Sequence, residues 1–148
     1  MNMRKILSLV ICCISLGSLG NVFAQKEQAL PKVKLKIKVQ NVESNEGRIM
    51  IAVYNSKKTF LKKAFTVMSV QTDSISVRPA FLSLPKGVYA ISLFQDANNN
   101  GKLDTGTFGI PTEKYGFSNN AEVFMGPPSF KSSSFNLDKD TTITINLR

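Results

Sequence analysis

Apolar and polar residues alternate strictly over residues 32–40, where Val33, Leu35, Ile37 and Val39 are separated by lysines. Successive side chains of a strand point to opposite faces, so a period of two predicts a strand with one buried face. The lysine row is typical of a solvated face that discourages edge-to-edge pairing. A binding face for an acidic polymer is the alternative interpretation.

Later apolar runs predict further short strands, separated by turn residues such as Asn45-Glu46-Gly47 and Pro85-Lys86-Gly87. The expected strands span residues 48–54, 64–70, 74–77 (with 81–84 as an extension), 88–95, 134–137 and 141–147. Residues 55–63 are expected to form a loop or a single helical turn, and residues 138–140 a hairpin turn.

About seven strands without a convincing helix indicate a single all-β domain over residues 32–148. The expected fold is an antiparallel β-sandwich of immunoglobulin-like or transthyretin-like layout, with one long loop. The alternation also predicts which side chains point into its core: Val33, Leu35, Ile37, Val39, Ile49, Ile51, Val53, Leu93, Ile143, Ile145 and Leu147.

Regular structure is expected to stop over residues 105–133, because glycine and proline recur there and forbid a long helix or a central strand. A loop of this length in a compact domain is usually functional or disordered. Aromatic residues spread through the stretch favour a packed loop: Phe108, Tyr115, Phe117, Phe124 and Phe130.

Between the strand at 88–95 and the long loop lies the sequence Asp-Ala-Asn-Asn-Asn-Gly-Lys-Leu-Asp, residues 96–104. Oxygen-bearing side chains stand at its relative positions 1, 3, 5 and 9 and glycine at position 6, which is most of the spacing of a calcium loop. The pattern predicts a calcium site with Gly101 at the sharp turn. Its expected ligands are four side chains and one backbone carbonyl: Asp96, Asn98, Asn100, Asp104 and the carbonyl of Lys102.

The loop departs from an EF-hand, because position 12 is Thr107 instead of a bidentate glutamate and the preceding element is a strand. Water, a hydroxyl oxygen of Thr105 or Thr107, or the carboxylate of Glu113 would complete the coordination. The competing interpretation is an Asn-Gly turn that accepts positive φ and binds no metal. Three adjacent asparagines between two aspartates in register favour calcium.

The first 24 residues resemble a secretory signal, with Arg4 and Lys5 before a largely apolar run over residues 6–19. The run is too short to read as a membrane span. Val22-Phe23-Ala24 resembles a cleavage site, so we expect an exported protein, periplasmic or extracellular, with a flexible leader at residues 25–31. Cys12 and Cys13 lie inside the signal, which would leave the mature chain without disulfide or thiol chemistry.

Cleavage would leave 17 basic and 10 acidic residues, a net charge of +7. Such a charge favours anionic polymers or membrane surfaces, but a soluble protein with a lysine-rich exterior is the preferred interpretation. The sequence has no basic-aromatic stripe of the kind that nucleic-acid binders use. We therefore expect a monomer with no nucleic-acid partner and no transmembrane segment in the mature chain.

Several segments together resemble a known family: Leu84–Ala90 (LPKGVYA), Asp96–Asp104, Gly109–Asn120 (GIPTEKYGFSNN) and Phe124–Phe130 (FMGPPSF). They are similar to the exported bacterial family catalogued as Domain of Unknown Function 2141, over nearly the whole mature chain. The resemblance implies an exported β-sandwich and no activity, since the family has none assigned. Gln95 stands where the resemblance leads us to expect a histidine, which leaves the proposed oxygen ligands intact.

These features indicate a calcium-stabilised binding or accessory module of the cell envelope, in which the long loop recognises a glycan, a peptide or an envelope protein. The residues suited to such contacts are aromatic, amide and other polar residues of that loop: Glu113, Tyr115, Phe117, Ser118, Asn119 and Asn120. The alternative for Tyr115 and Phe117 is that they cap the open end of the sandwich.

An enzyme is the rival class. The protein has no histidine, its two cysteines lie in the signal, and no Gly-x-Ser-x-Gly elbow occurs, so we expect no catalytic activity. A glycan-acting hydrolase with a carboxylate pair drawn from Asp96, Asp104 and Glu113 is the alternative. A third reading is a purely structural envelope subunit that docks by an exposed strand edge.

Overall fold

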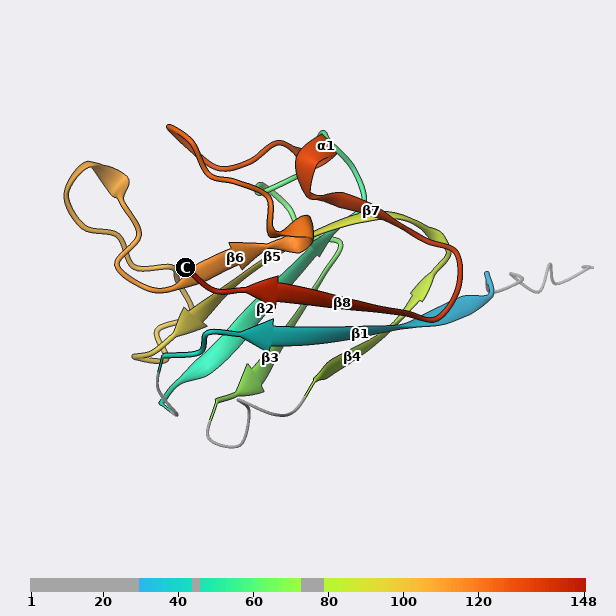
Figure 1. Ribbon diagram of the computed structural model, residues 1–148, viewed down its shortest axis with the longest axis horizontal. Helices are drawn as coiled ribbons and strands as arrows, with labels where there is room; N and C mark the ends of the chain where they lie inside the picture. The colour runs from blue at the N-terminus through green and yellow to red at the C-terminus, as the bar shows by residue number, and fades with distance from the viewer. Residues whose placement is uncertain (1–29, 44–45, 73–78) are drawn as a thin grey trace, which may run out of the picture.

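The computed structural model describes residues 30–43, 46–72 and 79–148. The expected signal peptide, most of the leader and the expected strand at 74–77 lie outside the described residues. Eight strands form two sheets that face each other in a sandwich-like arrangement (Figure 1). The all-β fold predicted from the sequence is therefore confirmed. No helix in the described part of the chain is long and apolar enough to cross a membrane.

One sheet has three strands in the order β4-β1-β8, formed by Ala80–Pro85, Lys32–Gln40 and Thr141–Asn146. The other has five strands. Its main path is β3-β2-β5-β6, formed by Thr66–Gln71, Arg48–Tyr54, Gly87–Asp96 and Tyr115–Phe117. The fifth strand, β7 (Ser134–Leu137), also pairs with β5.

The core lies between the two sheets, and every side chain that the alternation placed inward is found there. Leu35 and Ile37 of β1 are fully buried, as are Ile51 of β2, Ile145 of β8 and Leu137 of β7. Val33, Val39 and Ile143 are partly buried and pack against the same cluster. The period-two register predicted from the sequence is thus confirmed.

Two expectations need correction. Residues 138–140 do not make a hairpin turn, because β7 belongs to the five-stranded sheet and β8 pairs with β1 in the other sheet. The β1–β8 pair is parallel, so the sandwich is not antiparallel throughout. Residues 81–84 belong to β4, which pairs with β1, and the strand at 74–77 that they were expected to extend lies outside the described residues.

The long loop contains more regular structure than its glycines and prolines suggested. β6 adds a short strand at the edge of β5, and α1 (Phe130–Ser133) forms one helical turn capped by Ser129. The stretch also contains two 3-10 turns. η1 (Thr107–Gly109) precedes β6 in the chain, and η2 (Ser118–Asn120) lies between β6 and α1. A short strand of three residues with a central glycine has too little alternation to be recognised in a sequence.

Candidate functional site

The candidate site begins where β5 ends, at the Asp loop (residues 96–104). Asp96 is fully buried, and its Oδ2 accepts hydrogen bonds from Nε of Arg48 and from the backbone N–H of Gly101, each at 2.9 Å. Its Oδ1 accepts from the backbone N–H of Asn100, also at 2.9 Å. A buried carboxylate needs such partners to replace its lost hydration. Asp96 therefore ties the turn of the loop to the first residue of β2.

Glycine is required at two places around this turn. Gly101 has a φ of +79°, which agrees with the sharp turn expected from the sequence. Gly47 lies against the loop from the start of β2, and a Cβ there would come within 2.1 Å of the Asp96 carbonyl oxygen. Any other residue would push β2 away from the loop, so Gly47 is part of this site.

The remaining predicted ligands converge on Asp104. Nδ2 of Asn98 lies 2.6 Å from Oδ2 of Asp104, and Nδ2 of Asn100 lies 2.9 Å from Oδ1. The Oδ1 atoms of the two asparagines accept backbone N–H groups, from Asn100 at 3.1 Å and from Lys102 at 2.7 Å. The fold thus brings the side chains of Asn98, Asn100 and Asp104 together. The Asp96 carboxylate joins them through the backbone N–H of Asn100.

Glu113 closes the loop from the far side. Its Oε1 accepts the backbone N–H of Ala97 and its Oε2 that of Asp104, both at 3.0 Å. The backbone N–H of Thr112 donates to the Asp104 carbonyl at 2.9 Å. Glu113 does fold back onto the Asp loop, and there it acts as a hydrogen-bond acceptor for two backbone groups.

The Asp96 carboxylate is held in its charged form. Burial raises the pKa of this carboxyl, but hydrogen bonds from Arg48, Gly101 and Asn100, together with the Arg48 charge, outweigh burial and lower the pKa below its ordinary value. Asp96 is therefore ionised at neutral pH, where its ion pair with Arg48 links β2 and β5. Arg48 could not be identified from the sequence, because no residue near it in the chain indicates that it pairs with Asp96 on another strand.

The Asp loop contains the types of oxygen atom that hard cations accept. Calcium accepts carboxylate, amide and backbone carbonyl oxygens, all of which the loop offers. In the ranges 30–43, 46–72 and 79–148, no three His, Cys, Asp or Glu side chains form a metal-binding group. To serve as ligands, the two asparagines would have to turn their amide oxygens toward Asp104. Arg48 already balances the charge of Asp96.

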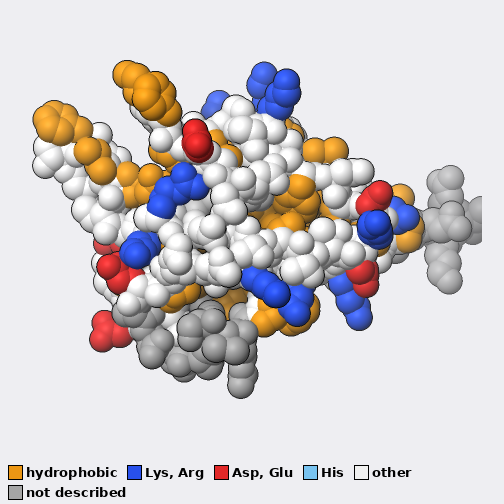
Figure 2. All heavy atoms as spheres, in the orientation of Figure 1, with side chains coloured by type: hydrophobic (Ala, Val, Ile, Leu, Met, Phe, Trp, Pro, Cys, Tyr) orange, Lys and Arg blue, Asp and Glu red, His pale blue; other side chains and the backbone are white. Residues whose placement is uncertain are grey.

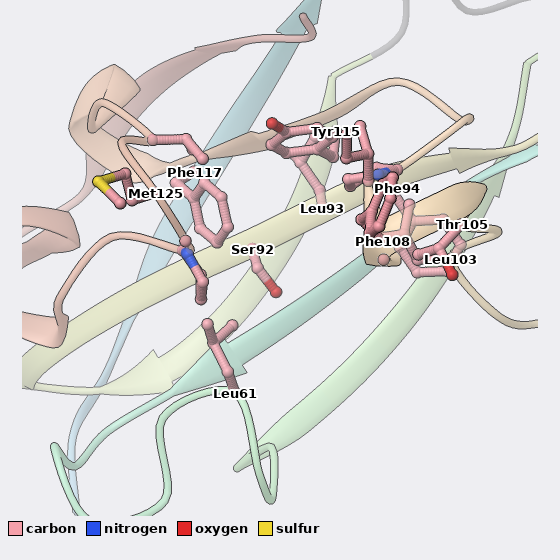
Figure 3. A pocket seen from close by; sticks show the side chains of 16 residues that line it. Leu61, Ser92, Leu93, Phe94, Leu103, Thr105, Phe108, Tyr115, Phe117 and Met125 are labelled. Carbon is pink, nitrogen blue, oxygen red and sulfur yellow. The ribbon is translucent and has the colours of Figure 1, made fainter.

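A groove of about 600 Å³ lies beside the Asp loop, on the outer face of the five-stranded sheet (Figure 3). Alternation along β5 sends Leu93 to the core and Ser92 and Phe94 to the outer face. The strand register sets Phe117 opposite Ser92 and Tyr115 opposite Phe94. The rings of Tyr115 and Phe117 stand edge to face, with centroids 6.1 Å apart. These outer-face side chains form the floor of the groove.

Three segments form its walls: the Phe108 loop (residues 105–111), the Met125 loop (residues 121–128) and the lysine turn (residues 57–63), which contributes Leu61. The Phe108 and Met125 loops project from the same end of the sandwich (Figure 1). Figure 2 shows hydrophobic side chains at the ends of two projections on that side. None of the 16 residues that line the groove is charged.

The ends of the two loops expose large apolar side chains. Phe108 is 95% exposed, Met125 94% and Phe124 85%, and Ile110 is exposed as well. Single exposed apolar residues are ordinary, but a group of them around an apolar groove is typical of an interaction site. The aromatic residues of the long loop were the sequence signal for this site, whereas Leu61 and Met125 carried none.

The backbone is strained at the same places. Seven described non-glycine residues have positive φ, and four of them are asparagines, which tolerate it. The other three are Leu61 (φ +56°), Phe108 (φ +62°) and Met125 (φ +53°). All three line the groove. Strain of this kind gathers at functional sites, because the surrounding structure must hold it in place.

Apart from Glu113, the predicted ligand-binding residues divide into two groups. Tyr115 and Phe117 line the groove. Ser118 is buried, and its Oγ accepts a backbone N–H of β5 at 2.8 Å. The side chains of Asn119 and Asn120 bond to the backbone of residues 132–134 and 144–146. The last three residues therefore connect η2 to neighbouring strands, and the groove takes its character from aromatic and aliphatic side chains.

These features define a β-sandwich domain with a groove built by two loops at one end. Residues 37–145 match the family described as "Uncharacterized protein conserved in bacteria (DUF2141)", and the chain belongs to that family. The match runs from β1 to β8 and includes the Asp loop and the groove, so the resemblance seen in the sequence motifs is confirmed. No curated protein and no solved structure matches the chain.

Proposed function

We propose that the protein is an exported binding module of the cell envelope and that its recognition site is the groove. The observation that carries the proposal is the left-handed backbone of Leu61, Phe108 and Met125 at the groove wall. Such conformations cost roughly 1–3 kcal/mol each for residues of this kind. Phe108 and Met125 are almost fully exposed and gain no compensating burial, which favours a role in binding over a role in stability.

Calcium at the Asp loop is the second part of the proposal. The ligand spacing and the convergence of Asn98 and Asn100 on Asp104 support it. Asp104 directly precedes the Phe108 loop, so an ion here would hold one wall of the groove. Export rests on the signal-like residues 1–24, and a secreted protein whose mass begins at Gln25 is its check.

The proposal assigns no catalytic role. The carboxylates that a hydrolase would need are engaged with the protein itself: Asp96 with Arg48 and two backbone N–H groups, and Glu113 with two backbone N–H groups. A general acid or base must be free to reach the substrate proton. This favours a binding module over the hydrolase alternative.

Binding by the groove is tested with a neutral apolar dye, N-phenyl-1-naphthylamine, whose fluorescence rises when it leaves water. Met125→Asn should weaken dye binding, because Met125 lines the groove and asparagine accepts its backbone conformation. Phe124→Asn is the matched control, since Phe124 is similarly exposed on the same loop but does not line the groove. A wild-type protein that leaves the dye dark would contradict the proposal.

Calcium is tested by thermal melting against a chelator. A dissociation constant of roughly 0.1–1 mM is typical of extracellular modules. A hundredfold excess over that constant would stabilise the fold by about 2.7 kcal/mol. For a domain of this size, the melting temperature should rise by roughly 5–10 °C. Magnesium should shift it much less, because it prefers a tight octahedral shell and keeps its waters.

The controls use single changes in the Asp loop. Asp104→Ala should abolish the calcium shift, whereas Lys102→Ala should preserve it, because only the backbone carbonyl of Lys102 is proposed as a ligand. A melting curve that is the same with chelator and with millimolar calcium would contradict calcium binding. The Asp loop would then be a turn held only by its own hydrogen bonds.

A further inference from the structure

The interior of the groove is neutral along its whole length. Tyr115 and Phe117 on the floor and Val123 and Pro127 on one wall present rings and aliphatic groups, and no lining residue is charged. Its volume of about 600 Å³ lies within the range of small-molecule sites, roughly 300–1,000 Å³. A charged group inside would lose its hydration without gaining a partner. The part of a ligand that enters the groove must therefore be largely hydrocarbon.

The lysine turn, which meets the groove at Leu61, is strongly basic. The lysine turn carries four exposed lysines around Leu61, the residue with which it lines the groove: Lys57, Lys58, Lys62 and Lys63. The chain has no acidic residue between Glu46 and Asp73. In the described part of the chain, none of the four lysines is in an ion pair. The turn is closed by a 2.9 Å hydrogen bond from the backbone N–H of Lys63 to the carbonyl of Thr59.

We infer that the groove binds an amphiphile with a single hydrocarbon chain and an anionic head, of the fatty-acid class. The chain lies over Phe117 and against Met125, and the carboxylate faces the lysine turn. The combination of a neutral apolar interior with an adjoining lysine turn that has no ion-pair partner carries this inference. It rests on the proposed binding role of the groove and adds the class of ligand.

Insertion of the loop ends into a bilayer is the competing use of the same apolar residues. A bilayer would engage Phe124 as strongly as Met125, since both are almost fully exposed. A ligand in the groove touches Met125 but not Phe124. The two uses therefore differ in how these neighbouring residues respond to substitution.

The experiment displaces N-phenyl-1-naphthylamine from the whole mature protein with octanoate, decanoate and dodecanoate, each below the concentration at which it forms micelles. Affinity should rise about tenfold with each added pair of methylenes, because each buried methylene contributes a constant transfer free energy. The alcohols of the same lengths should bind more weakly. Added salt should weaken the carboxylates and not the alcohols.

Variants locate the two ends of the ligand. Lys62→Glu with Lys63→Glu should weaken dodecanoate by about tenfold or more through charge reversal, and leave dodecanol unchanged. Lys32→Glu with Lys38→Glu, on the exposed face of β1, is the matched control and should change neither. Met125→Asn should weaken both compounds, and Phe124→Asn neither.

The outcomes separate this inference from the proposed function. Failure of the dye to bind overturns both. Dye that binds, but is displaced as well by alcohols as by carboxylates, overturns the fatty-acid class alone. A Lys62/Lys63 variant with unchanged dodecanoate affinity does the same. Equal losses for the Met125 and Phe124 variants, together with binding to anionic phospholipid vesicles, replace the groove ligand with a bilayer.

Discussion

The Asp loop and the Phe108 loop follow each other directly in the chain, but they are built in opposite ways. In the Asp loop, the carboxylates of Asp96 and Asp104 and the side-chain oxygens of Asn98 and Asn100 all accept hydrogen bonds from within the protein. The Phe108 loop is held at its base by backbone bonds such as Gly106 N–H to Ile110 O at 2.8 Å, and its end stands in water.

The comparison assigns the two loops different roles: the Asp loop supports the structure, and the Phe108 loop is available to contact a ligand. Asp96 gives the Asp loop its firm anchor, because it is fully buried and breaking its hydrogen bonds would leave a buried carboxylate without partners. Apolar side chains at an exposed loop end contribute little to folding, so they are available for a ligand. A stiff polar turn next to an exposed apolar loop is therefore a means of presenting a binding surface without relying on that surface for stability.

The largest expected effect comes from removing the anchor of the Asp loop. Asp96→Ala leaves two backbone N–H groups and the Arg48 guanidinium without their acceptor. Arg48 is 29% exposed and recovers some hydration, so we expect a loss of about 3 kcal/mol in the free energy of unfolding. Urea unfolding measures it. Asp138→Ala, at an exposed turn, is the control, and an equal loss in both variants would contradict the anchoring role.

A smaller effect is expected at the far side of the same loop. Glu113→Gln replaces one of two accepting oxygens with an amide group that faces a backbone N–H, which should cost about 1–3 kcal/mol. Glu122→Gln, in the exposed part of the Met125 loop, should cost less than about 0.5 kcal/mol. The same pair of variants tests the hydrolase alternative. Activity on a panel of glycans that disappears only in Glu113→Gln would make the protein an enzyme.

Acid should weaken the Asp loop through Asp96. Its pKa in the folded state is lower than the ordinary value of about 3.9, so the unfolded chain takes up the proton first. The stabilisation is complete above that ordinary value and is lost as the pH falls through the folded-state pKa. The advantage of the wild type over Asp96→Asn should therefore shrink in acid. A difference that stays constant down to the lowest usable pH would assign the stabilisation to packing.

The smallest effect is expected at the exposed ends of the groove loops. Phe108→Asn and Met125→Asn should cause no loss in the free energy of unfolding, because neither side chain is buried and asparagine adopts a positive φ at lower cost than phenylalanine or methionine. Leu93→Ala, in the core beneath the same groove, should cost about 2–5 kcal/mol. A loss of more than about 1 kcal/mol at Phe108 would mean that this loop serves stability and would remove the contrast with the Asp loop.

The sequence by itself determined most of the strands, their buried faces and the turn of the Asp loop. Alternation along residues 32–40 and 48–54 is a local property, and burial of one face follows from it directly. The order of oxygen-bearing residues around Gly101 is equally local, and the turn forms where that order predicts it. The family was also recognisable from its motifs, which are runs of adjacent residues.

Only the tertiary structure decided which distant segments meet. The alternation of apolar and polar residues predicts which face of β8 is buried, but not that β8 pairs in parallel with β1. For that reason residues 138–140 suggested a hairpin turn that the structure does not contain. The ion pair of Arg48 with Asp96 depends on the β2–β5 register. The groove joins Leu61 to Met125 across the outer face of a sheet. Contacts of this kind depend on how the strands are ordered in the sheets, which no local pattern of residues encodes.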